Sequence, residues 1–377
     1  MAGIYIHVPF CKQACYYCNF HFSTSLKGKN AFLTALLKEI DLQKDYLDKE
    51  EIATVYFGGG TPSLLTADEL NQILDKLHQT FRIKGDAEIT LEANPDDINN
   101  TSIAHWKQTG VNRFSIGVQS FFEEDLQWMH RAHTAVQASD CIKRVQDAGF
   151  NNLTIDLIYG TPTLPDEKWQ ANVAQAIALN IPHLSCYALT VEPQTALDTL
   201  IRKHKMSPVD PDAQARQFLL LMNWMQQAGY EHYEISNFAK PGMRSKHNSS
   251  YWQGKKYLGL GPSAHSYNGK ERQWNIPNNA RYAASLEKGE VPFEKEILTP
   301  VQQLNEYIMT ALRTAEGIDL ALTSTRFGAH TTAQLTKESL LFIQQGTVLN
   351  VNEHLILTKE GKLLADGIAS DLFFEET

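Results

Sequence analysis

The sequence predicts an α/β fold in which six parallel strands form an open, partial (β/α)6 barrel. Between residue 3 and about residue 190, short β-rich segments alternate with helical segments. Repeats of this kind build a parallel sheet with right-handed crossovers. Six repeats, rather than the eight of a complete TIM barrel, predict a TIM-like barrel that stays open on one side.

The individual elements follow from the spacing of apolar residues and from the residues that begin and end helices. Thr66 and Glu69 match a capping box at a helix start, and Gly110 and Gly149 are placed to end helices. Helices are predicted at residues 29–49, 66–80, 134–148 and 166–180. Strands are predicted at residues 3–8, 53–57, 87–93, 113–119, 152–159 and 183–190.

Changes in composition divide the chain into three predicted parts. Residues 1–230 carry the repeats and form the core. Residues 231–297, which are rich in Gly, Tyr, Ser, Asn and His, predict loops and short strands that close the open barrel. Residues 298–377 show two helical patterns, a β-hairpin that turns at Asn352 and Glu353, and an amphipathic helix. That order predicts a helical, winged-helix-like unit.

The composition is that of a globular protein without features of nucleic-acid binding or of a membrane span. The chain has 377 residues, 43% of them hydrophobic and 20% charged, and a net charge of −9. Nucleic-acid binding usually requires a basic face, so we expect no nucleic-acid partner. No apolar run approaches the roughly 20 residues of a membrane span, and no signal peptide is apparent. These features predict a cytoplasmic protein.

Three cysteines share one loop after the first predicted strand. Cys11, Cys15 and Cys18 have the spacing C-x3-C-x2-C. A closed zinc site takes four ligands, and a conventional iron–sulfur cluster takes four thiolates. Three thiolates therefore predict a 4Fe–4S cluster with one open iron, at which a small molecule can bind. Cys141 and Cys186 are isolated in a helical and a strand pattern, where we expect buried small hydrophobic residues.

Polar residues lie at or near the ends of the other predicted strands. Active sites of β/α barrels gather at the carboxyl ends of the strands, so these residues are expected at one rim. Successive glycines allow positive φ and a close backbone approach to a ligand, and the sequence lacks the Gly-Lys-Ser/Thr ending of a phosphate-binding P-loop. The residues concerned are GGGTP (residues 58–62), Glu92, Gln119, Arg131, Asp156, Tyr187 and Thr190.

The cysteine loop resembles that of the radical S-adenosylmethionine (SAM) superfamily. The resemblance implies that SAM binds the open iron and that an electron from the cluster cleaves SAM to a 5′-deoxyadenosyl radical. It spans essentially the whole chain and narrows to the coproporphyrinogen-dehydrogenase branch, whose marks here are Tyr5, GGGTP, Glu92 in LEANP, Gln119 with Arg131, and Asp156. By this resemblance the cluster-bound SAM is contacted by Tyr5, Gly59 and Glu92. Positions that hold a second SAM in the oxidase of this branch match Gly60, Thr61, Gln119, Arg131 and Asp156.

Within the branch, the chain resembles the HemW-type heme chaperones more than the oxygen-independent coproporphyrinogen III oxidases. The oxidases carry a longer N-terminal segment and a fourth cysteine at the position of Phe20. HNSSYW, residues 247–252, matches the HN-x-x-YW motif of the chaperones. The resemblance implies a protein that binds heme and delivers it to respiratory proteins, as a cytoplasmic protein that can lie against the inner membrane. It is compatible with a homodimer.

The ligand of the heme iron is open at this stage. His247 stands beside Tyr251 and Trp252, whose flat rings suit a porphyrin, and an imidazole can ligate heme iron. His247 could equally be a loop histidine bonded to backbone, and His265 or His232 could ligate heme instead. Two other functions also stay open: decarboxylation of the propionates of coproporphyrinogen III, and radical chemistry on another substrate. The absent fourth cysteine weighs against the former.

Overall fold

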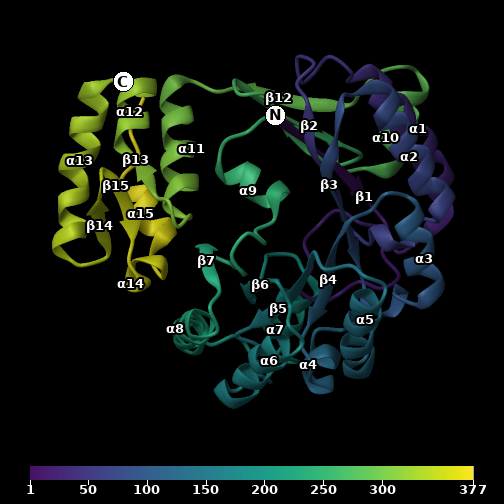
Figure 1. Cartoon of the computed structure of the whole chain (residues 1–377), viewed down its shortest axis with the longest axis horizontal. Helices are drawn as coiled ribbons and strands as arrows, with labels where there is room; N and C mark the ends of the chain where they lie inside the picture. Colours follow the sequence, from purple (N-terminus) through teal and green to yellow (C-terminus); the bar gives the residue numbers. More distant parts are fainter. Residues whose placement is uncertain (377) are drawn as a thin grey trace.

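The computed structural model describes residues 1–376, and its six central strands form the predicted partial barrel (Figure 1). Thr377, the last residue of the predicted C-terminal unit, lies outside the described residues. Neighbouring strands pair in sequence order and all six are parallel. They are β1 (Ala2–Val8), β2 (Ile52–Gly59), β3 (Ile83–Ala93), β4 (Arg113–Gln119), β5 (Leu153–Tyr159) and β6 (His183–Ala188).

Helices pack on the outer face of these strands, except the two short ones at residues 123–128 and 196–202, whose buried leucines form a separate cluster beside the cysteine loop. The capping box predicted for the second helix is present, with Glu69 N donating to Thr66 Oγ1 at 3.2 Å and Thr66 N donating to Glu69 Oε2 at 2.7 Å. The helix predicted at residues 29–49 ends at Leu42, and the residues after it form turns. The helices are α1 (Lys29–Leu42), α2 (Ala67–Thr80), α3 (Asn100–Gln108), α4 (Glu123–Trp128), α5 (Ala135–Asp147), α6 (Asp166–Ala178), α7 (Ala196–Arg202) and α8 (Pro211–Gln227).

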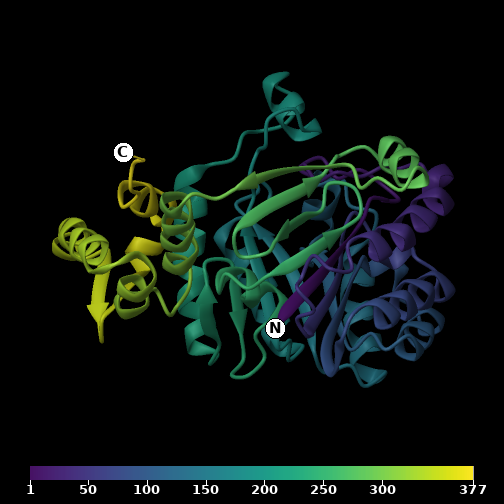
Figure 2. The same cartoon turned by 90° about the horizontal axis from the view of Figure 1, so that it is seen from above.

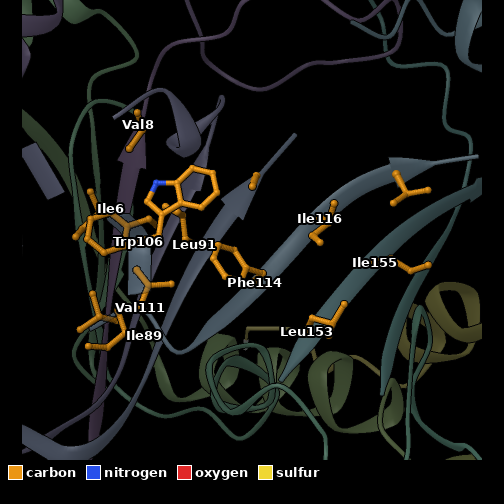
Figure 3. Close-up of a cluster of buried hydrophobic side chains, with 14 of the residues drawn as sticks. Ile6, Val8, Ile89, Leu91, Trp106, Val111, Phe114, Ile116, Leu153 and Ile155 are labelled. Carbon is orange, nitrogen blue, oxygen red and sulfur yellow. The ribbon is translucent and has the colours of Figure 1, made fainter. Parts of the chain in front are cut away.

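The main hydrophobic core lies between the strands and these helices (Figure 3). Alternate strand residues such as Ile6, Leu91 and Phe114 are fully buried in it, where Trp106 of α3 packs beside Phe114. Burying a side chain of this size stabilises the fold by roughly 1.5–3 kcal/mol. Because side chains alternate along a strand, the intervening residues point into the barrel, and many of them are polar.

Residues 231–297 extend the sheet at both edges. On one side β9 (Tyr257–Leu260) pairs in parallel with β1, and on the other β8 (Asn237–Ala239) pairs antiparallel with β6. Strands β12 and β7 are the two ends of the resulting sheet of twelve, so hydrogen bonding leaves the barrel open where we expected this segment to close it. The other elements of the segment are β7 (Glu231–Glu234), α9 (Lys246–Trp252), β10 (His265–Tyr267), β11 (Glu271–Asn275), α10 (Asn279–Glu287) and β12 (Phe293–Ile297).

The C-terminal unit has its own small core and lies beside the barrel (Figure 2). Its three strands have the order β13–β15–β14, and helices pack against them, as the predicted winged-helix-like unit requires. Asn352 and Glu353 adopt left-handed backbone conformations in the turn of the predicted hairpin. The elements are α11 (Pro300–Leu312), β13 (Ile318–Asp319), α12 (Leu320–Phe327), α13 (Ala329–Gln344), β14 (Val348–Val351), β15 (His354–Leu357), α14 (Lys359–Lys362) and α15 (Ala365–Asp371).

Helix α9 lies between the barrel and the C-terminal unit (Figure 1). It packs on the amino-terminal ends of β1 and β2, where its His247 contacts Gly3 and Thr54. Glu88, beside Thr54 in the register of β3, accepts hydrogen bonds from the backbone N–H groups of Lys246 and His247 at the start of the helix. None of the helices in residues 1–376 is long and apolar enough to span a membrane.

Candidate cofactor site

The cysteine loop leaves β1 at the carboxyl end of the barrel and is tied to two other segments of the chain. Cys11 N donates to Ser23 O at 3.0 Å, and Tyr16 N donates to Met129 O at 3.2 Å. The Tyr16 ring also stacks on His130, with 4.5 Å between the ring centroids. These contacts hold the loop across the strand ends. The three cysteines are only half-buried, so their thiols remain accessible.

The GGGTP segment fixes the start of this loop through its backbone. Gly60 N donates to Val8 O at 2.9 Å, and Thr61 N donates to Phe10 O. A Cβ on Gly60 would lie 2.6 Å from Phe10 O, and a Cβ on Gly59 would lie 2.7 Å from the His7 ring. Gly59 also has a φ of 105°. Packing within the chain therefore requires these two glycines, and the expected close approach of their backbone to a ligand stays a prediction.

The three cysteines open onto a cavity of about 430 Å³ at the rim of the barrel. The structure brings together in its lining ten of the residues predicted for the site. Tyr187 and Thr190, near the end of β6, line it as well. The ten are Cys11, Cys15, Cys18, Gly59, Gly60, Thr61, Glu92, Gln119, Arg131 and Asp156.

Arg131 places a positive charge beside the cysteines. Its Nη1 donates to Cys15 Sγ at 3.2 Å, and its Nη2 donates to Gly117 O and to Asn94 Oδ1, each at 2.9 Å. The Nε of Arg131 is buried without a partner among the described residues. A buried donor without a partner is costly, and here that cost falls on the guanidinium that lies beside the cysteines.

Two carboxyl groups line the cavity with raised pKa values. Burial raises the pKa of Glu92 to about 8, with a smaller contribution from the charge of Asp156, and Tyr56 OH donates to Glu92 Oε1 at 2.7 Å. Burial also raises the pKa of Asp156 to about 6. Buried carboxyl groups with raised pKa values that share one cleft are typical of a binding site.

The donor set suits an iron–sulfur cluster. Thiolates are the soft ligands that such clusters take, and burial raises the pKa values of Cys11 and Cys18, so binding of a cluster must release protons. In residues 1–376 no three His, Cys, Asp or Glu side chains converge as ligands of a single metal ion would. Three thiolates of a 4Fe–4S cluster bind three different irons and need not converge.

Two predicted site residues do not line the cavity. Tyr5 lies beneath it, where its OH shares a hydrogen bond of 3.2 Å with His7 Nδ1. His247 lies at the opposite end of the barrel and is fully buried. Its Nδ1 shares a 2.7 Å hydrogen bond with Thr54 Oγ1, and its Nε2 shares a 2.9 Å hydrogen bond with Tyr251 OH. In this conformation neither ring nitrogen is free to bind iron.

The two other candidate heme ligands, His232 and His265, differ in whether their ring nitrogens are engaged. His232 has both nitrogens engaged, with Nε2 at 3.0 Å from Ile235 O and Nδ1 at 2.9 Å from Lys362 Nζ. His265 is exposed, and its ring stacks near Trp274 with 6.1 Å between the centroids. Neither lines the cavity at the cysteine loop.

Asn94 and Ser115 line the cavity and were missed by sequence reasoning. Asn94 joins Arg131 to the GGGTP segment, since it also donates from Nδ2 to Thr61 Oγ1 at 3.3 Å. Ser115 lies directly beside Glu92 in the register of β3 and β4. Asn94 stands two residues after Glu92, and the alternation of inward residues was the signal that could have found both.

Known proteins resemble this chain over most of its length. Residues 5–175 match the Radical SAM superfamily, and residues 298–364 match the HemN C-terminal domain. The protein "Heme chaperone HemW" of Mycobacterium tuberculosis is 34% identical over 98% of this chain and 94% of its own length. The protein of the same name from Escherichia coli is 38% identical over 70% of this chain and 69% of its own length. The structure of E. coli coproporphyrinogen III oxidase covers 99% of this chain with a TM-score of 0.85, at 23% identity.

The partial barrel and its three-cysteine loop therefore define a radical SAM protein, the class that typically carries a 4Fe–4S cluster and SAM. Within that class the full-length similarity is decisive, because the relative from Bacillus subtilis is also 30% identical over 98% of both chains. The chain belongs to the HemW heme chaperone family. The likeness to the oxidase structure, at its low identity, shows a shared fold.

The first prediction concerns the cluster ligands. Replacing Cys11, Cys15 or Cys18 with Ala should remove the visible absorbance of a 4Fe–4S cluster after anaerobic reconstitution, because each thiolate holds one iron. Cys141→Ala and Cys186→Ala are matched controls, since both thiols are buried in the core. A requirement for either control cysteine would contradict the three-ligand site.

The second prediction uses the raised pKa of Glu92. Between its ordinary pKa of 4.5 and the folded value of about 8, the folded protein keeps a proton that the unfolded chain releases, so this group lowers stability as the pH rises. Glu92→Gln should therefore unfold less readily than the wild type at pH 8, by about 1–2 kcal/mol because water in the cavity screens the charge. At pH 5 urea denaturation should show almost no difference. A gain of equal size at both pH values would contradict this prediction.

The third prediction separates packing from iron binding at His247. His247→Ala leaves Thr54 and the Tyr251 hydroxyl without their partner and opens a cavity, so it should lower the free energy of unfolding by about 2–4 kcal/mol. Because both ring nitrogens are engaged, the variant and the wild type should give the same optical spectrum when hemin is added. A changed spectrum with unchanged stability in urea would show that His247 ligates iron.

Proposed function

We propose that this chain is a heme chaperone that holds a 4Fe–4S cluster and SAM at the barrel rim, binds heme, and delivers it to respiratory proteins. The observation that carries the proposal is similarity over nearly the whole chain to several proteins named heme chaperone HemW. Their name supports heme as the cargo. Delivery to respiratory proteins at the inner surface of the membrane is our proposal from the family resemblance.

One residue at the rim supports this function over oxidase activity. Phe20 lines the cavity and is 66% exposed, at the position where the sequence pattern of the oxidases places a fourth cysteine. An exposed large aromatic side chain at the mouth of a cofactor cavity suits contact with a partner or with a flat ligand. The Phe20 side chain lacks the thiol that the oxidases carry at this position.

The lining residues have distinct proposed tasks toward SAM. Glu92 and Asp156 offer carboxylates to cationic groups of the ligand, and Arg131 offers a positive charge to an anionic group. Gln119, held at a φ of 66°, presents its amide from the last position of β4. The cluster and SAM, when bound, supply one-electron chemistry. The chain binds and orients them and limits the access of water.

The three parts of the chain divide the work in this proposal. Residues 1–230 hold the cluster and SAM, residues 231–297 connect the barrel to the C-terminal unit, and residues 298–377 cover the barrel and contact partners. The match of residues 298–364 to the HemN C-terminal domain supports the last boundary.

The fourth prediction tests the proposed function directly. Anaerobically purified full-length protein should bind hemin with a shifted Soret band that survives gel filtration. With SAM and a reductant, it should convert no coproporphyrinogen III to protoporphyrinogen IX, as chromatography of the porphyrins would show. Sustained oxidase turnover without heme binding would contradict the chaperone proposal and show that the protein is an oxidase.

A further inference from the structure

A second cavity lies between α9, the sheet and the C-terminal unit. Its volume is about 550 Å³, within the range of roughly 300–1,000 Å³ that ligand pockets usually have. It shares no lining residue with the cavity at the cysteine loop. The strand register places it on the other side of the barrel, since α9 covers the amino-terminal ends of β1 and β2. Nothing in the proposed SAM chemistry uses it.

The walls of this cavity carry flat aromatic side chains. Tyr251 and Trp252, the last two residues of HNSSYW, line it from α9, and Tyr257 and Tyr267 line it from the sheet. Tyr307 lines it from α11 of the C-terminal unit. The Tyr251 and Tyr257 rings meet edge to face with 4.6 Å between their centroids. Aromatic side chains that line one cavity from two separate units suit a flat, conjugated ligand.

Cations at the cavity add a preference for an anionic ligand. Arg326 and Lys255 are exposed, and within residues 1–376 neither forms an ion pair. Arg326 lies over the Tyr307 ring, 5.7 Å from its centroid. Arg244 and Arg272 also line the cavity but are already paired with acidic residues. Two free cations match a ligand with two carboxylates.

His354 provides an imidazole with one free nitrogen. It is half-buried at the start of β15 and lines the cavity. Its Nδ1 lies 3.0 Å from Asn352 O, so Nδ1 carries the proton and donates it to that carbonyl. Nε2 then keeps its lone pair, and its nearest charged neighbour is Asp319 Oδ2 at 3.9 Å. A histidine that ligates metal typically donates its other nitrogen to a carbonyl in this way.

We propose that this second cavity is the heme site, with His354 Nε2 as the axial ligand of the iron and Arg326 and Lys255 as partners of the propionates. The inference rests on the proposed function and assigns a place to its cargo. The aromatic pair of HNSSYW forms one wall, and His247 supports that wall from behind by its hydrogen bond to Tyr251. The motif therefore serves heme through its aromatic residues.

His247 also joins the two cavities physically. Its ring stacks on Tyr56 with 4.9 Å between centroids, and Tyr56 donates to Glu92 in the lining of the cysteine cavity. The contact path thus runs from Tyr251 through His247 and Tyr56 to Glu92. Because the cavities are otherwise separate, heme binding should not require the cluster.

The fifth prediction tests this location with hemin as the probe and the full-length protein as host. His354→Ala should lower hemin affinity about tenfold or more and remove the imidazole signature from the optical and electron paramagnetic resonance spectra. Added free imidazole should restore the spectrum. Arg326→Glu, an exposed change at the cavity, should weaken hemin binding severalfold. The variant lacking all three loop cysteines should bind hemin like the wild type.

Two matched variants serve as controls. His330→Ala removes an exposed histidine of α13, and Arg144→Glu reverses an exposed charge on α5, and neither residue lines the cavity. Both should bind hemin normally. If the wild type binds hemin and the variants at His354 and Arg326 bind it with unchanged affinity and spectrum, the location is wrong. If the wild type binds no hemin, the proposed function itself fails.

Discussion

The polar interior of the barrel is the constraint on which the rest of the structure depends. Alternation along six parallel strands buries one face under helices and turns the other face inward, where polar groups must find partners. Some of these hydrogen-bond partners are residues that follow position 230. His183 of β6, which shares a hydrogen bond with Thr154, also shares one of 2.7 Å with Tyr233 OH. Ser185 donates to Asn237 at 2.7 Å. The later segment is thus part of the barrel's own hydrogen bonding.

The two ends of the barrel differ in what surrounds the polar side chains that point inward. At the amino-terminal end α9 supplies the partners: Glu88 accepts two backbone N–H groups, and His247 satisfies Thr54. At the carboxyl end, Glu92 and Asp156 keep raised pKa values and Arg131 keeps an unpaired Nε. The amino-terminal end is therefore covered by α9, whereas the carboxyl end opens onto a cavity lined by buried acids that a charged ligand can partner.

The proposed sites of the cofactor and of the heme are separate cavities, and packed side chains connect them. The cysteine loop depends on backbone packing against GGGTP, which leaves no room for a side chain at Gly60. The second cavity depends on how the C-terminal unit sits against α9, since its walls come from both. Side chains in such a dense interior respond to one another, and the contacts through His247 and Tyr56 connect the two regions.

The sequence by itself determined the β/α order, the cysteine spacing and the residues at the strand ends, because each follows from local periodicity or from spacing along one segment. It placed ten of the twelve predicted site residues at one rim, since parallel strands bring their carboxyl ends together. Only the tertiary structure decided the position of His247. A histidine beside two aromatic residues looks like a ligand in sequence, but here both its nitrogens are taken by side chains that lie far away or one turn along the helix. His354 shows the reverse case, because the sequence does not indicate that this histidine lines a cavity between two units.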